Sequence, residues 1–350
     1  MTGRFGSWVD ERTGLGRPLR AFLNYPVPAY VHKNLLYSLG GLTLINLLLQ
    51  MLSGALLLFY YDPSPEAAYN SVDYITYYVP MGWLVRGFHH YGASAMVILV
   101  ALHMVRTYFF SAYKKPREIN WLSGVALLFI TLSFGFTGYL LPWDQKGYWA
   151  TKVGTEIVGS TPLVGESLLR LIRGGEHLGQ LTLTRFYAVH IILLPTLLIL
   201  LVLLHIQQLR HHGMAPPITQ RAQTQAHQSA PFFPNWVLTD LLLGLTLIGL
   251  LAWLSWTYRA PLEFPADPSS NEYLPRPEWY FLFLFQMLKY FPGPLEPVAT
   301  VVIPLLAVGS LLALPFVDTS DERRPWRKPV TTTVGLLSIA AIVVLTILAL

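Results

Sequence analysis

The chain has 350 residues, of which 53% are hydrophobic and only 12% are charged. A soluble domain carries about 25% charged residues, so this composition excludes an ordinary soluble protein and indicates that lipid is the solvent. The absence of cysteine excludes disulfide scaffolds and thiolate metal sites. The net charge of +5 gathers on one side of the predicted membrane, so we expect no nucleic-acid partner.

Seven stretches are long enough to cross a bilayer, whose core of about 30 Å needs about 20 apolar residues in a helix. They are Leu35–Tyr60, Gly87–Phe110, Ile119–Leu141, Phe186–Leu209, Trp236–Tyr258, Pro297–Val317 and Val330–Leu350. The run Trp279–Phe291 is too short to cross and is predicted to be a re-entrant or interfacial helix. The run Leu163–Ile172 is predicted to be an amphipathic surface helix.

Lysine and arginine predict the direction of these spans. They lie in the N-terminal arm and in the loops after the second, fourth and sixth spans: Arg4, Arg12, Arg17, Arg20, Lys33, Lys114, Lys115, Arg117, Arg210, Arg221, Arg323, Arg324, Arg327 and Lys328. The loop after the first span instead carries Asp62, Glu66 and Asp73. We therefore expect a cytoplasmic N-terminus and an external C-terminus. The N-terminus has no apolar signal core, so we expect the mature protein to begin at Met1.

The spans fall into two groups. A Pro- and Gln-rich stretch without apolar periodicity, residues 213–234, is predicted to be a linker between them. The predicted fold class is therefore an all-α membrane protein with a four-helix bundle in residues 1–212 and a three-helix half in residues 235–350.

Histidine falls at matched depths in two spans. The second span holds His89 and His103, and the fourth holds His190 and His205. A single such residue could be a hydrogen-bonded core histidine, but ligating residues inside spans are costly and usually functional. Both spans run from outside to inside, so the four histidines form an outer and an inner layer about 21 Å apart at 1.5 Å per residue.

The histidine spacings allow two imidazoles to meet in each layer. Fourteen residues, as in the second span, are close to four turns, whereas the fifteen in the fourth overshoot by roughly 60°. Pro195 lies between His190 and His205 and permits a bulge that absorbs one residue. We therefore predict two bis-histidine b-type haem sites in a four-helix core. Zinc is disfavoured because it takes three or four clustered ligands.

Glycines repeat at the same interval. Gly40 and Gly54 lie in the first span, and Gly124 and Gly138 in the third. A macrocycle between helices needs neighbours without side chains at its own depth, so we predict that these glycines flank the haems. Close helix packing is the alternative explanation.

Three further residues bear on these sites. His90 competes with His89 as a ligand, but its separation from His103 fits one helical face less well. Arg86 and Arg106 each lie three residues from a ligand on the same face and are predicted to pair with haem propionates. Anchoring at the membrane interface is the alternative, and it fits Arg106 better than Arg86.

Several runs resemble cytochrome b, the quinol-handling subunit of bc and bf complexes: GWLVRGFHHYGAS, GFTGYLLPWDQKGYWA, LTRFYAVHIILLP and PRPEWYFLF. The PWDQKGYWA version and the fifteen-residue histidine step are similar to the cytochrome b6 branch, and the last three spans resemble its separate subunit IV, fused here. That branch attaches an extra haem to a cysteine in a YCLGG stretch. Ser38 stands at this position, so a covalent third haem is impossible.

The resemblance implies two quinone sites. At the outer site Glu278 would bind quinol and carry a proton away, with Tyr139, Tyr280 and Phe281 beside it and Pro142–Gly147 as the other wall. A carboxyl among aromatics and prolines is desolvated, which suits proton transfer; a solvated loop acid is the alternative. At the inner site Asp240 would donate protons and Arg210 would supply a cation, with His211 and His212 as further candidates.

The implied function is that of a proton-translocating quinol–cytochrome c oxidoreductase subunit in a bacterial plasma membrane. A Rieske iron–sulfur protein and a c-type cytochrome would be its partners, in a homodimeric complex. The alternatives are a dihaem anchor of another quinone-linked dehydrogenase or reductase, and a haem-free transporter whose histidines relay protons. A retinal protein is excluded because the last span lacks the necessary lysine.

Overall fold

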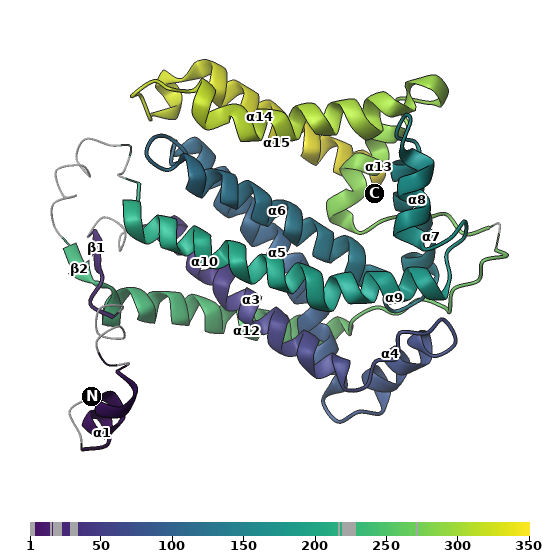
Figure 1. Cartoon of the computed structure of the whole chain (residues 1–350), viewed down its shortest axis with the longest axis horizontal. Helices are drawn as coiled ribbons and strands as arrows, with labels where there is room; N and C mark the ends of the chain where they lie inside the picture. Colours follow the sequence, from purple (N-terminus) through teal and green to yellow (C-terminus); the bar gives the residue numbers. More distant parts are fainter. Residues whose placement is uncertain are drawn as a thin grey trace.

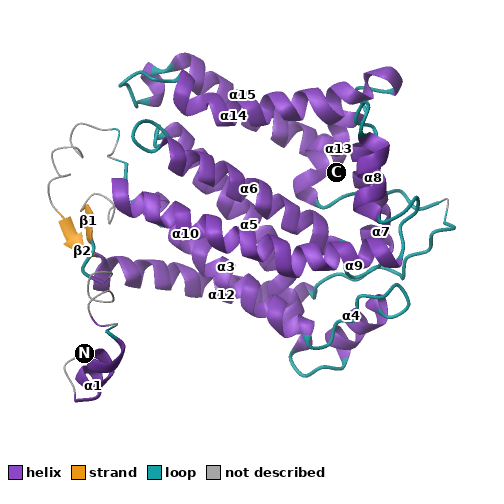
Figure 2. Ribbon diagram, viewed as in Figure 1, coloured by secondary structure: helices purple, strands orange, loops and turns teal. Residues whose placement is uncertain are grey.

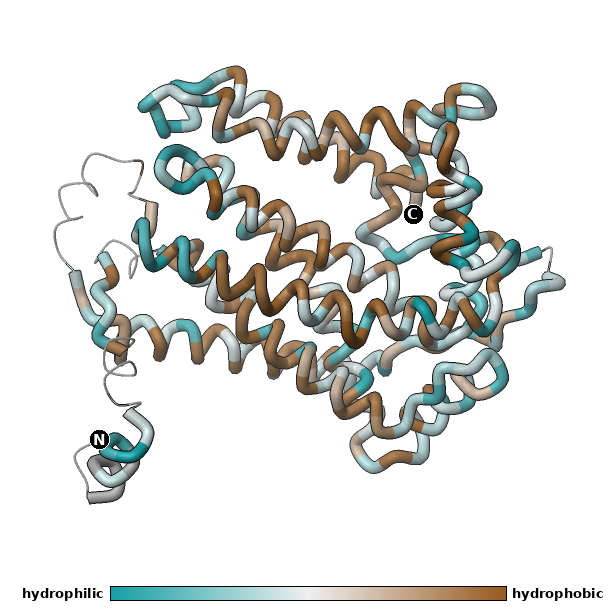
Figure 3. Tube along the Cα trace, viewed as in Figure 1, coloured by the Kyte–Doolittle hydropathy of each residue, from teal (hydrophilic) through white to brown (hydrophobic). Residues whose placement is uncertain are grey.

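The computed structural model describes residues 4–14, 16, 23–28, 34–215, 218, 229–270 and 272–350. Arg17, Arg20, Lys33, Arg221 and most of the predicted linker lie outside these residues. Seven helical segments in the described part are long and apolar enough to cross a membrane, as predicted. Apolar residues cover their middle portions and hydrophilic residues gather towards their ends (Figure 3).

The spans are mostly α-helical (Figure 2). The first three are α3 (Leu39–Leu58), α5 (Gly82–Phe109) and α6 (Glu118–Tyr139). The fourth joins α9 (Gln180–Ala188), η3 (Val189–Leu193) and α10 (Leu194–His212). The last three are η5 (Phe232–Trp236) with α12 (Val237–Tyr258), then η7 (Gly293–Leu295) and η8 (Val298–Val302) with α14 (Ile303–Val317), and α15 (Pro329–Ala349).

The first four spans form the predicted bundle. Helix α3 packs against α5, α5 against α6, and α6 against α10. Helix α12 covers α3 and α5, whereas α14 lies against α6. The termini lie at opposite ends of the bundle (Figure 1), and the fold class is the one that the sequence predicts.

Short helices gather at one end of the bundle, which we call the α7 end (Figure 1). They are α4 (Ala68–Tyr77), α7 (Gln145–Gly159), α8 (Gly165–Arg173), and η6 (Trp279–Phe281) followed by α13 (Leu282–Leu288). Helices α8 and α13 match predicted short helices, but α4 and α7 were not predicted.

The opposite end, the β1 end, carries a small antiparallel sheet (Figure 1). Strand β1 (Pro26–Pro28) pairs with β2 (Ser229–Pro231), and β2 lies inside the stretch predicted to be a linker. The remaining elements are α1 (Arg4–Thr13), η2 (Leu35–Tyr37) and η9 (Pro325–Arg327). The sheet holds the chain before α3 beside the chain before α12.

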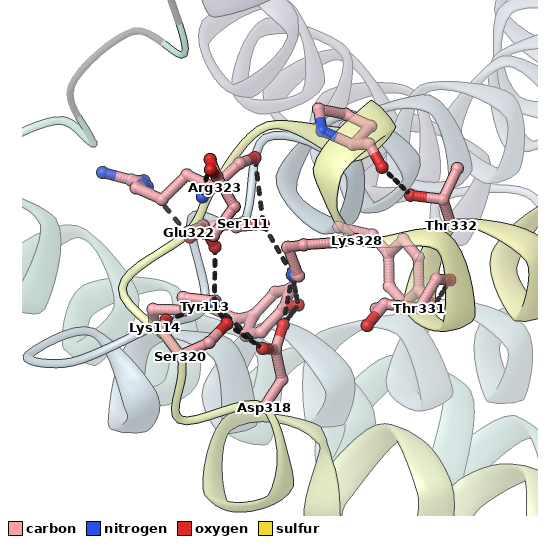
Figure 4. Close-up of polar contacts among 12 residues, drawn as sticks. Ser111, Tyr113, Lys114, Asp318, Ser320, Glu322, Arg323, Lys328, Thr331 and Thr332 are labelled. Atoms are coloured by element: carbon pink, nitrogen blue, oxygen red, sulfur yellow. Dashed lines mark hydrogen bonds and ion pairs between the residues drawn. The ribbon is translucent and has the colours of Figure 1, made fainter.

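A buried polar cluster at the β1 end joins the two halves (Figure 4). Asp318, after α14, accepts hydrogen bonds from Lys114 (2.9 Å), Lys328 and the Tyr113 hydroxyl. Lys328 also donates to Tyr113 Oη at 2.8 Å. Burial opposes ionisation of Asp318, but the hydrogen bonds from these neighbours outweigh it and lower its pKa to about 2. The cluster therefore links the loop after α5 to the loop before α15.

We expect Asp318→Asn to lower the Tm of the purified protein by roughly 5 °C or more, because Lys328 loses its buried counter-charge. The folded-state pKa lies below the unfolded value of about 3.9, so this stabilisation is complete above that value and is lost as the pH falls towards 2. Thermal unfolding across pH measures both effects. Glu322→Gln, in the same loop, is the control, because the Glu322 side chain is 27% exposed in its ion pair with Arg324 against 11% for Asp318. Equal Tm values for the two variants would contradict the prediction.

Candidate functional site

A cavity of about 1110 Å³ extends through the bundle from Glu278 at the α7 end to Asp240 at the β1 end. Every residue of the main predicted set lines it: His89, His103, His190, His205, Gly40, Gly54, Gly124, Gly138, Arg86, Arg106, Arg210, Tyr139, Glu278, Tyr280 and Asp240. The secondary candidates His211, His212 and Phe281 do not line it. The predicted site residues therefore share one continuous space.

The four histidines form two layers with equal geometry. The ring centres of His89 and His190 are 6.3 Å apart, and those of His103 and His205 are also 6.3 Å apart. Two imidazoles bound at about 2 Å on opposite sides of one metal atom have ring centres about 6 Å apart. Each layer therefore fits a bis-imidazole metal centre. Among the described residues no group of three or more His, Asp or Glu side chains is arranged to hold a metal ion.

A π-helical turn brings His190 and His205 into line. The π-helix η3 spans Val189–Leu193 and ends two residues before Pro195. A π-turn contains one residue more than an α-turn would need, so it absorbs the extra residue of the fifteen-residue step. The bulge predicted near Pro195 is present.

Each glycine lies opposite one imidazole. A Cβ atom on Gly54 would lie 3.0 Å from His89 Cε1, and one on Gly138 would lie 2.7 Å from His190 Cε1. In the other layer Gly40 faces His103 Cε1 at 3.3 Å and Gly124 faces His205 Cε1 at 3.4 Å. The four glycines therefore lie at the depths of the four histidines, as the spacing predicts. They make room for the imidazole rings, a contact that the prediction did not include.

Three candidate cations line the cavity, each with protein neighbours. Arg86 is 8% exposed and donates hydrogen bonds to the carbonyls of Ala260 (2.8 Å) and Pro261, so it fastens the loop after α12 to α5. The Arg106 guanidinium lies 3.9 Å from the ring centre of Tyr37. Pairing of Arg86 and Arg106 with propionates stays a prediction, as does the role of Arg210.

Glu278 forms an ion pair that sequence reasoning missed. Lys146 Nζ lies 2.8 Å from Glu278 Oε1, and the Glu278 side chain is 16% exposed. Asp144 caps α7 by accepting the Gly147 N–H at 2.8 Å, and it also accepts the Glu263 N–H at 3.2 Å. Asp144 thereby fixes the start of α7, and with it Lys146, against the loop that leads towards Glu278.

The aromatic residues after Glu278 are packed against the bundle. Tyr280 is 8% exposed and lies against Gly135 of α6, where a Cβ atom would approach its hydroxyl at 2.8 Å. Burial, and then the charge of Glu278, raise the pKa of Tyr280, so the phenol keeps its proton. Phe281 packs on Phe136, with ring centres 6.4 Å apart, which explains why it does not reach the cavity.

Asp240 occupies the β1 end of the cavity on the first turn of α12. A side chain on Gly41 of α3 would collide with its carboxyl group, so Gly41 provides the space for this acid. His211 and His212 instead lie against each other, with ring centres 4.6 Å apart, and are not part of the cavity wall.

The fold and the site define a class: a membrane-spanning helical bundle with two layers of paired imidazoles, each with the spacing of a bis-imidazole metal centre. Residues 22–213 match the family model described as Cytochrome b/b6/petB, and residues 265–350 match the one described as Cytochrome b(C-terminal)/b6/petD. The chain belongs to the cytochrome b/b6 family.

Individual relatives agree with this assignment. The cytochrome bc complex cytochrome b subunit of Chlorobaculum thiosulfatiphilum is 36% identical over 343 residues, covering 96% of this chain and 78% of that protein. Cytochrome b6 of Prochlorococcus marinus (strain MIT 9303) is 46% identical over 213 residues, covering 60% of this chain and 96% of that protein. A solved structure titled hyperthermophilic respiratory Complex III matches with a TM-score of 0.87 and 28% identity, covering 98% of this chain and 90% of that chain.

These findings establish the chain as a cytochrome b subunit of a bc/b6f-type complex. It is an integral membrane protein of electron transport, with seven helical segments suited to cross the bilayer. Membership of the family implies b-type haems, and the two imidazole layers are the places in this chain that fit them.

Proposed function

We propose that this chain oxidises quinol at the α7 end of its cavity and delivers electrons to quinone at the β1 end, as part of a quinol–cytochrome c oxidoreductase. The observation that carries the proposal is the alignment within one cavity. Two imidazole pairs with the same 6.3 Å separation lie between Glu278 at one end and Asp240 at the other.

His89 and His190 would hold the outer haem, and His103 and His205 the inner one. The haems, when bound, supply one-electron transfer between the two ends of the cavity. The imidazoles set the positions of the irons, and the cysteine-free chain leaves iron–sulfur and c-type haem chemistry to other subunits. We therefore propose a Rieske protein and a c-type cytochrome as partners in a homodimeric complex.

Quinol oxidation releases two electrons and two protons, so the site needs proton acceptors. Glu278 would accept one proton from a quinol hydroxyl, with Lys146 holding the carboxylate in place between turnovers. The second proton would leave with the electron that passes to the iron–sulfur partner. Because Tyr280 keeps its proton, it would act as a hydrogen-bond donor. One electron would pass to the iron–sulfur partner and the other would cross this chain.

At the β1 end, quinone reduction consumes protons. Asp240 would deliver them, with Arg210 on the same cavity wall supplying positive charge for the developing anion. With the N-terminus in the cytoplasm of a bacterial cell, protons would enter at the β1 end and leave at the α7 end. The cycle would therefore build a proton gradient across the plasma membrane.

Spectroscopy of the purified complex tests the proposal. We expect two low-spin b-type haems per chain in reduced-minus-oxidised spectra, a co-purifying Rieske subunit, and quinol-dependent reduction of cytochrome c. A single haem per chain would contradict the ligand assignment. Two haems without a Rieske partner would favour a dihaem anchor of another enzyme.

We expect Asp240→Asn to slow reoxidation of the haems by quinone by about 10²-fold, the effect of losing one proton-transfer group. Haem content and the first electron transfer from quinol should stay normal because Asp240 is remote from the α7 end. Stopped-flow absorbance measures the reoxidation rate. Thr239→Ala is the matched control on the neighbouring position, and unaltered reoxidation in Asp240→Asn would remove Asp240 from the inner site.

A further inference from the structure

Besides its facing glycine, each of three of the four imidazoles has a serine or threonine hydroxyl group as a neighbour. Ser53 Oγ lies 3.1 Å from His89 Nδ1, Thr137 Oγ1 lies 3.0 Å from His190 Nδ1, and Ser123 Oγ lies 2.9 Å from His205 Nδ1. Each hydroxyl residue directly precedes the glycine that faces the same ring. One Ser-Gly or Thr-Gly pair therefore holds each of these rings, with the glycine at Cε1 and the hydroxyl at Nδ1.

The hydroxyl groups define the direction of these hydrogen bonds. Each donates its own proton to a carbonyl of its helix: Ser53 to Leu49, Ser123 to Asn120 and Thr137 to Ser133, all at 2.8 Å. The oxygen is then free to accept from the ring, and a metal bound at Nε2, as the proposed function requires, leaves the ring proton on Nδ1 to make this bond.

His103 differs from the other three. Leu39 precedes the facing glycine, Gly40, and within the described part of the chain His103 Nδ1 is buried without a hydrogen-bond partner. Leu39 lies at the start of α3, and its side chain has no hydroxyl group that could accept a hydrogen bond from the ring. Both outer imidazoles thus have a hydroxyl partner, whereas only one of the two inner imidazoles has one.

We infer that Ser53, Ser123 and Thr137 are positioning residues that set the haem potentials unequally, and that the missing hydroxyl at residue 39 keeps the inner potential above the outer. The inference rests on the ligand assignment of the proposed function. Donation from Nδ1 makes an imidazole a stronger donor to its metal, which stabilises ferric iron and lowers the potential. Two such ligands outside and one inside favour electron flow from the outer layer to the inner.

The test is an optical redox titration of both haems in the purified complex. Ser53→Ala should raise the outer potential and Ser123→Ala the inner, each by about a tenfold change in the reduced-to-oxidised ratio, or about 59 mV for a one-electron couple. Leu39→Ser should lower the inner potential, because residue 39 precedes Gly40 as Ser53 precedes Gly54. Thr137→Ser, which keeps the hydroxyl, should retain the outer potential, and Ser133→Ala, whose hydroxyl donates to Phe129, is the control for α6.

The outcomes distinguish a failure of this inference from a failure of the proposed function. If two haems titrate and neither Ser53→Ala nor Leu39→Ser moves its potential in the stated direction, the inference is wrong and the proposed function stands. If the wild-type complex lacks a pair of bis-imidazole haems, the proposed function itself fails. Should Ser53→Ala lose its haem, Leu39→Ser still decides the matter, since it adds a group and removes no hydrogen bond from a ligand.

Discussion

His103→Leu is expected to abolish the inner haem and about half of the b-type absorbance of the purified complex. Leucine supplies no lone pair, and His205 alone leaves one side of the metal without its protein ligand. Quinol would then reduce the outer haem once, and no inner haem would be present to reoxidise it. Steady-state turnover should therefore fall to a small fraction of the wild-type rate. Difference spectra and rapid-mixing kinetics of the outer band measure the two effects.

His90→Leu is the matched control on the same helix. His90 also lines the cavity, but within the described residues its ring neighbour is Tyr91 and no imidazole faces it as His190 faces His89. We expect this variant to keep both haems. If His103→Leu retains both haems, or if His90→Leu loses one, the assignment of the haem ligands is wrong.

Features that depend on the length or the periodicity of one segment could be predicted from the sequence. The membrane thickness sets a minimum length for each span, so the seven spans follow from composition alone. Helical periodicity places His89 and His103 on one face, and the fifteen-residue step with Pro195 requires a bulge, which the structure provides as η3.

Features that depend on contacts between distant segments could not be predicted. Helix α7 starts where Asp144 caps it, and the same carboxylate accepts a hydrogen bond from Glu263. The partner of Glu278, Lys146, lies on the first turn of α7. The family resemblance places the stretch Pro142–Gly147 beside Glu278, but no local pattern shows that Lys146 pairs with it. The charge and depth of Arg86 suit the predicted contact with a haem propionate. Its carbonyl partners, Ala260 and Pro261, belong to a segment that only the fold brings near.

The glycines show where periodicity stops being informative. A fourteen-residue repeat gives depth, but it does not say which atoms a glycine faces, and here those atoms are the Cε1 carbons of the imidazoles. A further signal was visible in the sequence, since Ser53, Ser123 and Thr137 each precede one of these glycines and Leu39 breaks the pattern. Its meaning required the hydrogen bonds to Nδ1.

Glu278→Gln is expected to slow quinol oxidation by about 10²-fold or more, the loss typical of removing a proton acceptor. The amide keeps the size of the side chain but cannot take a proton from quinol. Because Glu278 does not belong to either imidazole layer, haem content and potentials should stay normal. Quinol–cytochrome c reductase assays across pH measure the effect, and full-speed oxidation at every pH would exclude Glu278 from the proton route.

Lys146 gives this prediction a second, independent readout. Its ammonium group lies 2.8 Å from the Glu278 carboxylate, so Lys146→Gln removes the group that holds this proton acceptor in place. The whole pH–rate profile of quinol oxidation in Lys146→Gln should therefore lie about tenfold below that of wild type, because the carboxylate is less well positioned towards the quinol hydroxyl. Lys152→Gln removes a cation from the same helix whose ammonium lies over Trp149, and its profile should match wild type. If Lys146→Gln and Lys152→Gln give the same profile, the ion pair has no part in controlling the proton acceptor, and Lys146 only fastens α7 to the loop before η6.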